Sequence, residues 1–165
     1  MKIESDQDID ELIRCPKIIF KPPNKEMIIK FGCLRNDIEL YKEDDEDLKF
    51  SVFIRINERF RENFSIGLRV YPKGNPSMHL LRFNGKHGEY KDFVTESTHF
   101  EYHIHRATVE TISDKLPYAE VTDRYASYEE ALKYFLEYTN IINSEKYFKI
   151  SSQLSLFPKL EEGKE

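Results

Sequence analysis

Two neighbouring stretches of the chain alternate between apolar and mostly polar residues, which is the pattern of half-buried β-strands. The first runs from Phe50 to Asn57, and the second from Phe64 to Tyr71 after a short charged link. Together they predict a β-hairpin. Further strands are expected between turns rich in proline, glycine or acidic residues, over residues 26–34, 35–41 and 78–84.

The most distinctive alternating stretch contains three of the five histidines, His99, His103 and His105. Side chains alternate across a strand, so a single strand over 99–105 would direct Phe100, Tyr102 and Ile104 toward a core. The opposite face would then carry the polar residues His99, Glu101, His103 and His105. The pattern therefore predicts a histidine-rich sheet face.

Amphipathic segments near both ends predict helices that cover the apolar face of the sheet. Ser5 is a suitable cap for a helix ending near Arg14, and Ser127 with Glu130 matches a capping box. A stripe at helical spacing follows Ser127, namely Leu132, Phe135, Leu136, Tyr138, Thr139 and Ile142. A shorter helix is predicted over 108–115.

These elements predict an α+β fold, in which an antiparallel sheet of five or six strands has helices packed on one face. The 165 residues are enough for one domain, and we assign it to residues 1–145. The more polar C-terminal tail, residues 146–165, is expected to attach loosely.

Composition and charge narrow the class of protein. A content of 33% charged and 13% aromatic residues is typical of a globular chain, and no apolar run approaches the ~20 residues of a membrane span. Without a secretory signal pattern at its start, the chain is expected to be cytoplasmic and to have no membrane partner. Cys15 and Cys33 have no metal or redox spacing and are predicted to be reduced.

The net charge of −5 argues against indiscriminate binding to nucleic acid, yet residues 49–106 contain ten Lys or Arg and only six Asp or Glu. Arginine suits phosphate groups, and histidine transfers protons near neutral pH. We therefore predict a catalytic group on the polar sheet face, formed by Arg82, His87, His103 and His105. The predicted nucleic-acid contacts are Arg55, Arg69 and Arg106, and the same register puts His79 in the core. The alternative is an ordinary solvated sheet surface with weak cross-strand pairs.

No cofactor or metal is predicted. His103-x-His105 followed by Glu110 resembles the first metal motif of cupins, but the glycines of that motif and its second half are missing. Phosphate-binding loops, dinucleotide fingerprints and a serine triad are also missing from the sequence. The sequence leaves open whether the chain is an enzyme.

Two segments carry a resemblance to a family of short bacterial proteins for which no activity is known. They are Arg82-Phe83-Asn84-Gly85-Lys86-His87-Gly88 and His103-Ile104-His105-Arg106-Ala107-Thr108. The order of these segments before a final helix is also distantly similar to TumE-type toxins of toxin–antitoxin systems. This chain has Lys86 and Gly88 beside the loop histidine, where those toxins tend to have proline and a second histidine. The resemblance implies a toxin directed at nucleic acid, with a cognate antitoxin as partner.

The tail contains a second motif, Gln153-Leu154-Ser155-Leu156-Phe157. It resembles the pentapeptide by which bacterial replication and repair proteins bind the DNA polymerase sliding clamp. The resemblance implies that Gln153 enters a polar pocket and that Leu156 and Phe157 fill an apolar one, while Leu154 and Ser155 set the extended path. Alternatively, the segment packs on its own domain as a last strand.

Two classes of function follow from these patterns. The first is a bacterial or mobile-element accessory protein that binds the sliding clamp through its tail and acts on nucleic acid through the His/Arg face. The second is a toxin-like nuclease, or a non-catalytic inhibitor or interaction protein, whose tail merely packs.

Overall fold

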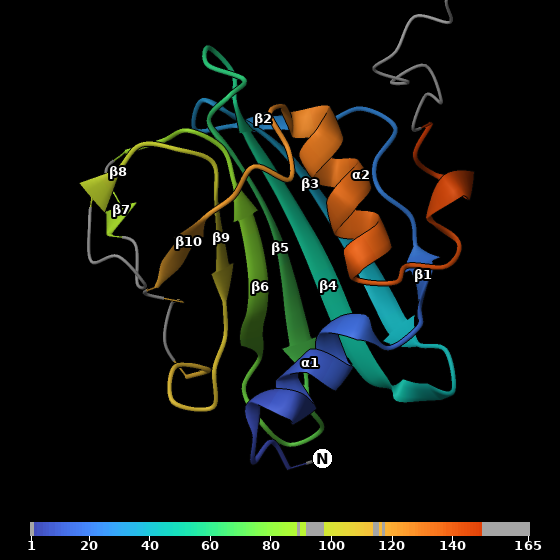
Figure 1. Ribbon diagram of the computed structural model, residues 1–165. Helices are drawn as coiled ribbons and strands as arrows, with labels where there is room; N and C mark the ends of the chain where they lie inside the picture. Colours follow the sequence, from blue (N-terminus) through green and yellow to red (C-terminus); the bar gives the residue numbers. More distant parts are fainter. Residues whose placement is uncertain (1, 89, 92–97, 114–115, 117, 150–165) are drawn as a thin grey trace, which may run out of the picture.

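The computed structural model describes residues 2–88, 90–91, 98–113, 116 and 118–149. Eight strands form one antiparallel sheet in the order β1-β3-β4-β5-β6-β9-β10, with β2 pairing the other end of β3. Helices α1 and α2 lie against one face of this sheet (Figure 1). We call the helix-covered face the inner face and the opposite one the outer face. The α+β class and the antiparallel sheet are thus as predicted, but the sheet has more strands than the five or six expected.

The helices are α1 (Asp6–Arg14), α2 (Tyr128–Tyr138) and the short 3-10 helix η1 (Ser144–Lys146). The sheet contains β1 (Lys17–Lys21), β2 (Ile28–Lys30), β3 (Cys33–Lys42), β4 (Asp45–Asn57), β5 (Phe64–Tyr71), β6 (Met78–Asn84), β9 (His103–Arg106) and β10 (Ala119–Val121). A separate two-stranded ribbon is formed by β7 (Tyr90–Lys91) and β8 (Thr98–His99).

The predicted hairpin forms the centre of the sheet. Strands β4 and β5 pair along their length, from Lys49 opposite Tyr71 to Ile56 opposite Phe64. The apolar positions of both strands are buried on the inner face, where they meet Ile9, Ile13 and Phe135 of the helices. The alternation in the sequence thus reflects one buried sheet face.

Both predicted helix caps are formed. Ser5 Oγ accepts a hydrogen bond from the backbone N–H of Asp8, and the Asp8 carboxylate accepts one from the backbone N–H of Ser5. Ser127 Oγ accepts from the backbone N–H of Glu130, whose carboxylate accepts from the backbone N–H of Ala126. Each cap satisfies N–H groups that a helix start leaves without intrahelical partners.

A buried lysine joins the C-terminal ends of the two helices. Lys17 is 0% exposed, and its Nζ donates to the carbonyl oxygens of Ile13, Cys15 and Thr139 at 2.8–3.0 Å. These carbonyls come from the end of α1 and the residue after α2. Burial lowers the pKa of Lys17 to about 8, so the ammonium remains charged at neutral pH. One cation therefore satisfies the oxygens that two helix ends leave unpaired.

Three local predictions were wrong. The single strand expected over 26–34 is a hairpin, because the chain reverses at Phe31 and Gly32, which both have positive φ. The described part of 108–115 forms turns and no helix. Helix α2 ends at Tyr138, so Ile142 lies beyond it and is 48% exposed.

An irregularity in β6 decides which side chains reach the outer face. Leu68 pairs with Leu81, but the next residue, Arg69, pairs with His79, so Leu80 is an extra residue in β6. Such a bulge reverses the alternation of the side chains that precede it. His79, which was predicted to be in the core, therefore lies on the outer face beside Arg69, while Leu80 and Leu81 are both buried.

Candidate functional site on the outer face

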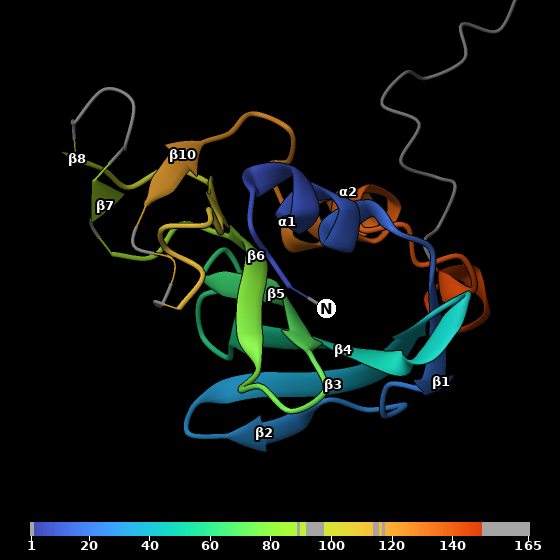
Figure 2. The ribbon, with the colours of Figure 1, turned by 90° about the horizontal axis from the view of Figure 1, so that it is seen from below.

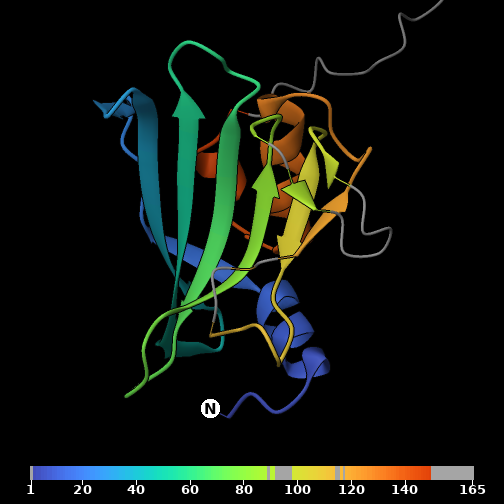
Figure 3. The same ribbon diagram turned by 90° about the vertical axis from the view of Figure 1, so that its left-hand side faces the viewer.

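The four residues predicted to be catalytic lie together on the outer face. The register places Asn84 opposite His103 and Arg82 opposite His105 on the neighbouring strands β6 and β9, which Figure 3 shows from the outer side. The ring centroids of His103 and His105 are 5.1 Å apart, and that of His87 is 5.6 Å from His103. We call Arg82, His87, His103 and His105 the histidine cluster.

The histidine-rich stretch does not form one strand, and its exposure differs from the prediction. Strand β8 ends at His99 and β9 begins at His103, so the chain leaves strand geometry between them. Phe100, expected in the core, is 61% exposed, whereas Tyr102 is buried as predicted. His103 and His105 are 0% and 2% exposed, because segments after β6 and β9 cover this end of the outer face.

A chain of hydrogen bonds fixes His103. Ser65 Oγ donates to Asn84 Oδ1 at 2.7 Å, Asn84 Nδ2 donates to His103 Nε2 at 3.1 Å, and His103 Nδ1 donates to the carbonyl of Glu101 at 2.8 Å. Since a carbonyl only accepts, this arrangement places the proton of neutral His103 on Nδ1. Both ring nitrogens are thus engaged within the protein.

Three further histidines, namely His105, His79 and His87, have pKa values below the ordinary histidine value. His105 Nδ1 donates to the carbonyl of Leu116 at 2.7 Å, and burial together with the Arg82 charge lowers the pKa of His105 to about 3. Burial and the charges of Arg69 and Arg82 lower the pKa of His79 to about 4. The pKa of His87 is lowered by the same two effects, burial and Arg82. At pH 7 these imidazoles are therefore uncharged.

The loop that carries His87 is anchored by a close backbone approach. Gly85 and Lys86 donate their N–H groups to the carbonyls of Phe64 and Glu62 at 2.9 and 2.8 Å. A Cβ at Gly85 would lie 1.8 Å from the Glu62 oxygen, so only glycine fits there. The loop therefore starts at a fixed point, and it leaves His87 only partly buried above His103.

A second group of side chains surrounds Phe53 on the same face. A Cβ at Gly67 would lie 2.2 Å from the Phe53 ring, which shows that the ring lies directly over this glycine. The Arg55 and Arg69 guanidinium carbons are 5.6 and 5.0 Å from the ring centroid, and His79 meets the ring edge-on. Phe53 is only 8% exposed, so this cation–aromatic group is tightly packed.

The predicted nucleic-acid contacts do not lie on one surface. Arg55 and Arg69 share the outer face, but Arg55 Nη2 donates to both carboxylate oxygens of Asp37, at 2.8 and 3.2 Å. Arg106 pairs with Leu81 in the register and so lies on the inner face, where it forms an ion pair with Asp10. Arg106 is thus separated from the other two by the sheet.

The structure places no metal site among the described residues, in which no group of three or more His, Cys, Asp or Glu could hold an ion. No helix in the described parts of the chain is long and apolar enough to cross a bilayer. The predicted clamp-binding residues 153–157 lie outside the described residues.

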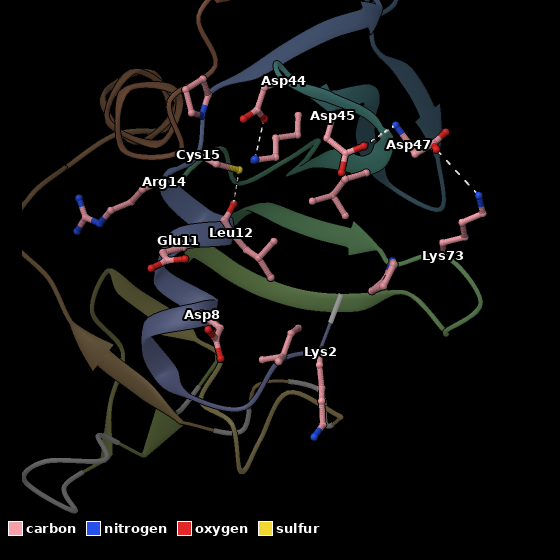
Figure 4. A pocket seen from close by; sticks show the side chains of 15 residues that line it. Lys2, Asp8, Glu11, Leu12, Arg14, Cys15, Asp44, Asp45, Asp47 and Lys73 are labelled. Carbon is pink, nitrogen blue, oxygen red and sulfur yellow. Dashed lines mark hydrogen bonds and ion pairs between the residues drawn. The ribbon is translucent and has the colours of Figure 1, made fainter.

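A large hollow lies elsewhere, between α1 and the turns that follow β3 and β5 (Figure 4). It has a volume of about 830 Å³, and both acidic and basic side chains line it. Lys42 pairs with Asp44 at 2.6 Å, and Lys73 lies 4.0 Å from Asp47. Because these charges neutralise one another, the hollow shows no preference for one sign of ligand.

Sequence reasoning missed two contributors to the outer face. Phe53 occupies a polar position of the alternation in β4, and Ser65 lies opposite Asn84. Gly67 could have indicated that a side chain such as Phe53 packs over this strand, because a glycine inside a strand often marks the close approach of another group.

Comparison of the chain with models of protein families, with curated proteins and with solved structures finds no match.

Proposed function

We propose that this chain is an accessory protein of DNA replication or repair that binds the polymerase sliding clamp through residues 153–157. The observation that carries this proposal is the sequence Gln153-Leu154-Ser155-Leu156-Phe157. A chance match to such a motif is expected in on the order of a few per ten thousand chains of this length.

The chemistry of the pentapeptide supports the proposal. A short peptide with two large apolar anchors, Leu156 and Phe157, binds reversibly, because most of the energy comes from a few buried side chains. Reversible binding suits a protein that has to leave the clamp to other partners.

The clamp proposal is tested by surface plasmon resonance with immobilised bacterial sliding clamp and the full chain. Loss of both anchors in Leu156→Ala/Phe157→Ala should weaken binding at least tenfold, about 1.4 kcal/mol. Leu160→Ala, which removes a leucine outside the pentapeptide, is the matched control and should bind like the unchanged chain. No binding by the intact chain, or equal binding by the double variant, would reject the proposal.

We further propose that the domain contacts nucleic acid through the outer face and does not use His103 as a catalytic group. A catalytic group has to touch the substrate, and His103 is buried with both ring nitrogens hydrogen-bonded inside the protein. The same burial favours a positioning role for His105. Arg69 is the more available cation, because Arg55 is paired with Asp37.

A toxin-like nuclease is the second candidate, and the position of His87 favours it. This residue is partly buried, neutral at pH 7 and close to Arg82, so it could take a proton while the guanidinium holds a phosphate. A cognate antitoxin would be the expected partner of such a toxin.

Incubation of the full chain with RNA and with single- and double-stranded DNA, with and without divalent metal ions, tests the nuclease. Cleavage should disappear in His87→Ala and persist in His79→Ala, which removes a histidine at the other end of the outer face. Thermal melting of both variants reports whether they fold. Cleavage that survives His87→Ala would refute the assigned role.

A further inference from the structure

The sheet is wider than the layer of helices, and its inner face has a hollow at the β9–β10 corner. This corner pocket has a volume of about 340 Å³ and lies between α1, α2 and strands β6, β9 and β10, which are close together in Figure 2. Its floor is apolar and is made of Leu81, Phe83 and Ile104. The volume is at the lower end of the range for small-molecule pockets.

Two guanidinium groups meet in the corner pocket at a single oxygen. Arg14 Nη2 donates to Tyr138 Oη at 3.1 Å, and Arg106 Nη1 donates to the same oxygen at 3.3 Å. Arg14 also lines the edge of the large hollow, and Figure 4 shows its side chain directed away from Asp44 and Asp45. Like charges held this close repel each other unless an anion lies nearby.

The carboxylates nearby offset only part of this positive charge. Asp10 forms an ion pair with Arg106, whereas no ion pair between described residues includes Arg14. Arg124 adds a third guanidinium to the lining, and Glu120 adds one carboxylate. The rim of the pocket therefore has several N–H donors suited to an oxyanion such as phosphate.

Aromatic rings form the wall of the pocket beside these donors. The ring centroids of Phe83 and Tyr134 are 5.4 Å apart, those of Tyr134 and Tyr138 are 5.7 Å apart, and Arg14 lies 4.4 Å above the Tyr138 ring. Such a wall favours a flat ring, and Glu120 can accept a hydrogen bond from an amino or hydroxyl group.

We propose that the corner pocket binds a nucleoside 5′-monophosphate, either free or as the phosphorylated 5′ end of a nucleic-acid strand. The phosphate lies between Arg14, Arg106 and Arg124, and the base packs against the aromatic wall. Inorganic phosphate would leave this wall unused, and an unphosphorylated nucleoside would leave the guanidiniums unused. The site does not depend on clamp binding, so loss of one activity leaves the other intact.

Isothermal titration of the full chain with adenosine 5′-monophosphate, ribose 5-phosphate, adenosine and inorganic phosphate tests the proposal. The monophosphate should bind at least tenfold more tightly than each of the other three. Arg14→Gln and Arg124→Gln should each weaken this binding at least fivefold. Arg124 is exposed, and no described hydrogen bond involves its side chain. Arg124→Gln should therefore weaken ligand binding without destabilising the fold.

Arg59→Gln, an exposed arginine in the β4–β5 turn, is the matched control and should bind normally. Short DNA strands with 5′-phosphate or 5′-hydroxyl ends distinguish the two sources of the ligand. A preference for the phosphorylated end identifies the strand end as the occupant, and binding of the monophosphate without that preference identifies the free nucleotide. No binding of the monophosphate at millimolar concentration, equal binding of adenosine, or unchanged binding in both arginine variants would overturn the proposal.

Discussion

We expect the folded domain to lose stability between pH 7 and pH 5, because His105 is buried in its neutral form. The side chain is 2% exposed, and burial with the nearby Arg82 charge lowers its pKa from 6.5 to about 3. Between these two pKa values the unfolded chain binds a proton that the native chain does not bind. The free energy of unfolding therefore falls as the pH is lowered through this window.

The size of this effect follows from the two pKa values of His105. At pH 5 the unfolded state gains about 2 kcal/mol from protonation of this residue, against about 0.2 kcal/mol at pH 7. His79, with its pKa lowered to about 4, acts in the same direction. Asp8 and Asp44 also have lowered pKa values, but their stabilisation is lost only at more acidic pH, below the ordinary carboxylate value of 3.8. The histidines therefore lose their contribution to the free energy of unfolding at a higher pH than these two carboxylates.

Urea unfolding of the full chain at pH 5, 6 and 7 measures this contribution. In His105→Gln, the amide can still donate a hydrogen bond to the Leu116 carbonyl but cannot bind a proton in this window. From pH 7 to pH 5, the unchanged chain should lose about 2 kcal/mol more stability than the variant. An equal loss in the two proteins would refute the reasoning, even if the variant were less stable at every pH.

Two further predictions concern packing. Lys17→Met should destabilise the domain by about 3 kcal/mol, because three buried carbonyl oxygens lose their donor, whereas Lys21→Met on the exposed part of β1 should have little effect in the same thermal unfolding experiment. Equal stability of the two lysine variants would contradict this role. Gly67→Ala should cost about 1–3 kcal/mol, because its Cβ would overlap the Phe53 ring, and this cost should disappear in a Phe53→Ala background. A cost that persists there would show that the ring is not the obstacle.

Features of the fold that depend on local sequence were predictable. Ser5 and Ser127 were recognised as caps because the capping hydrogen bonds involve residues three positions apart. The β4–β5 hairpin was recognised because its alternation reflects one buried face. The short strand β10 was missed, because a strand of three residues is too short to show a period.

The site was harder to predict, because its exposure depends on distant segments. The alternation correctly put His103 and His105 on the face opposite Ile104, but it could not show that other parts of the chain cover them. The bulge at Leu80 places His79 on the outer face, and the sequence of β6 contains no residue pattern that predicts this bulge. The position of Arg106 could have been predicted. It follows His105 in β9, so the alternation of side chains places it on the inner face, away from Arg55 and Arg69.

The residues of the histidine cluster differ in how far they are buried. The pairing of β6 with β9 brings Arg82, His103 and His105 to one face, and the loop after β6 adds His87, yet sharing a face gives no access to a substrate. His103 and His105 are enclosed and hydrogen-bonded, so their removal should reduce stability before it reveals any chemical role. His87 is only partly buried and is carried by a loop anchored at Gly85. Among the three histidines of the cluster, His87 is therefore the one whose side chain reaches the surface in part, and it lies above the ring of His103.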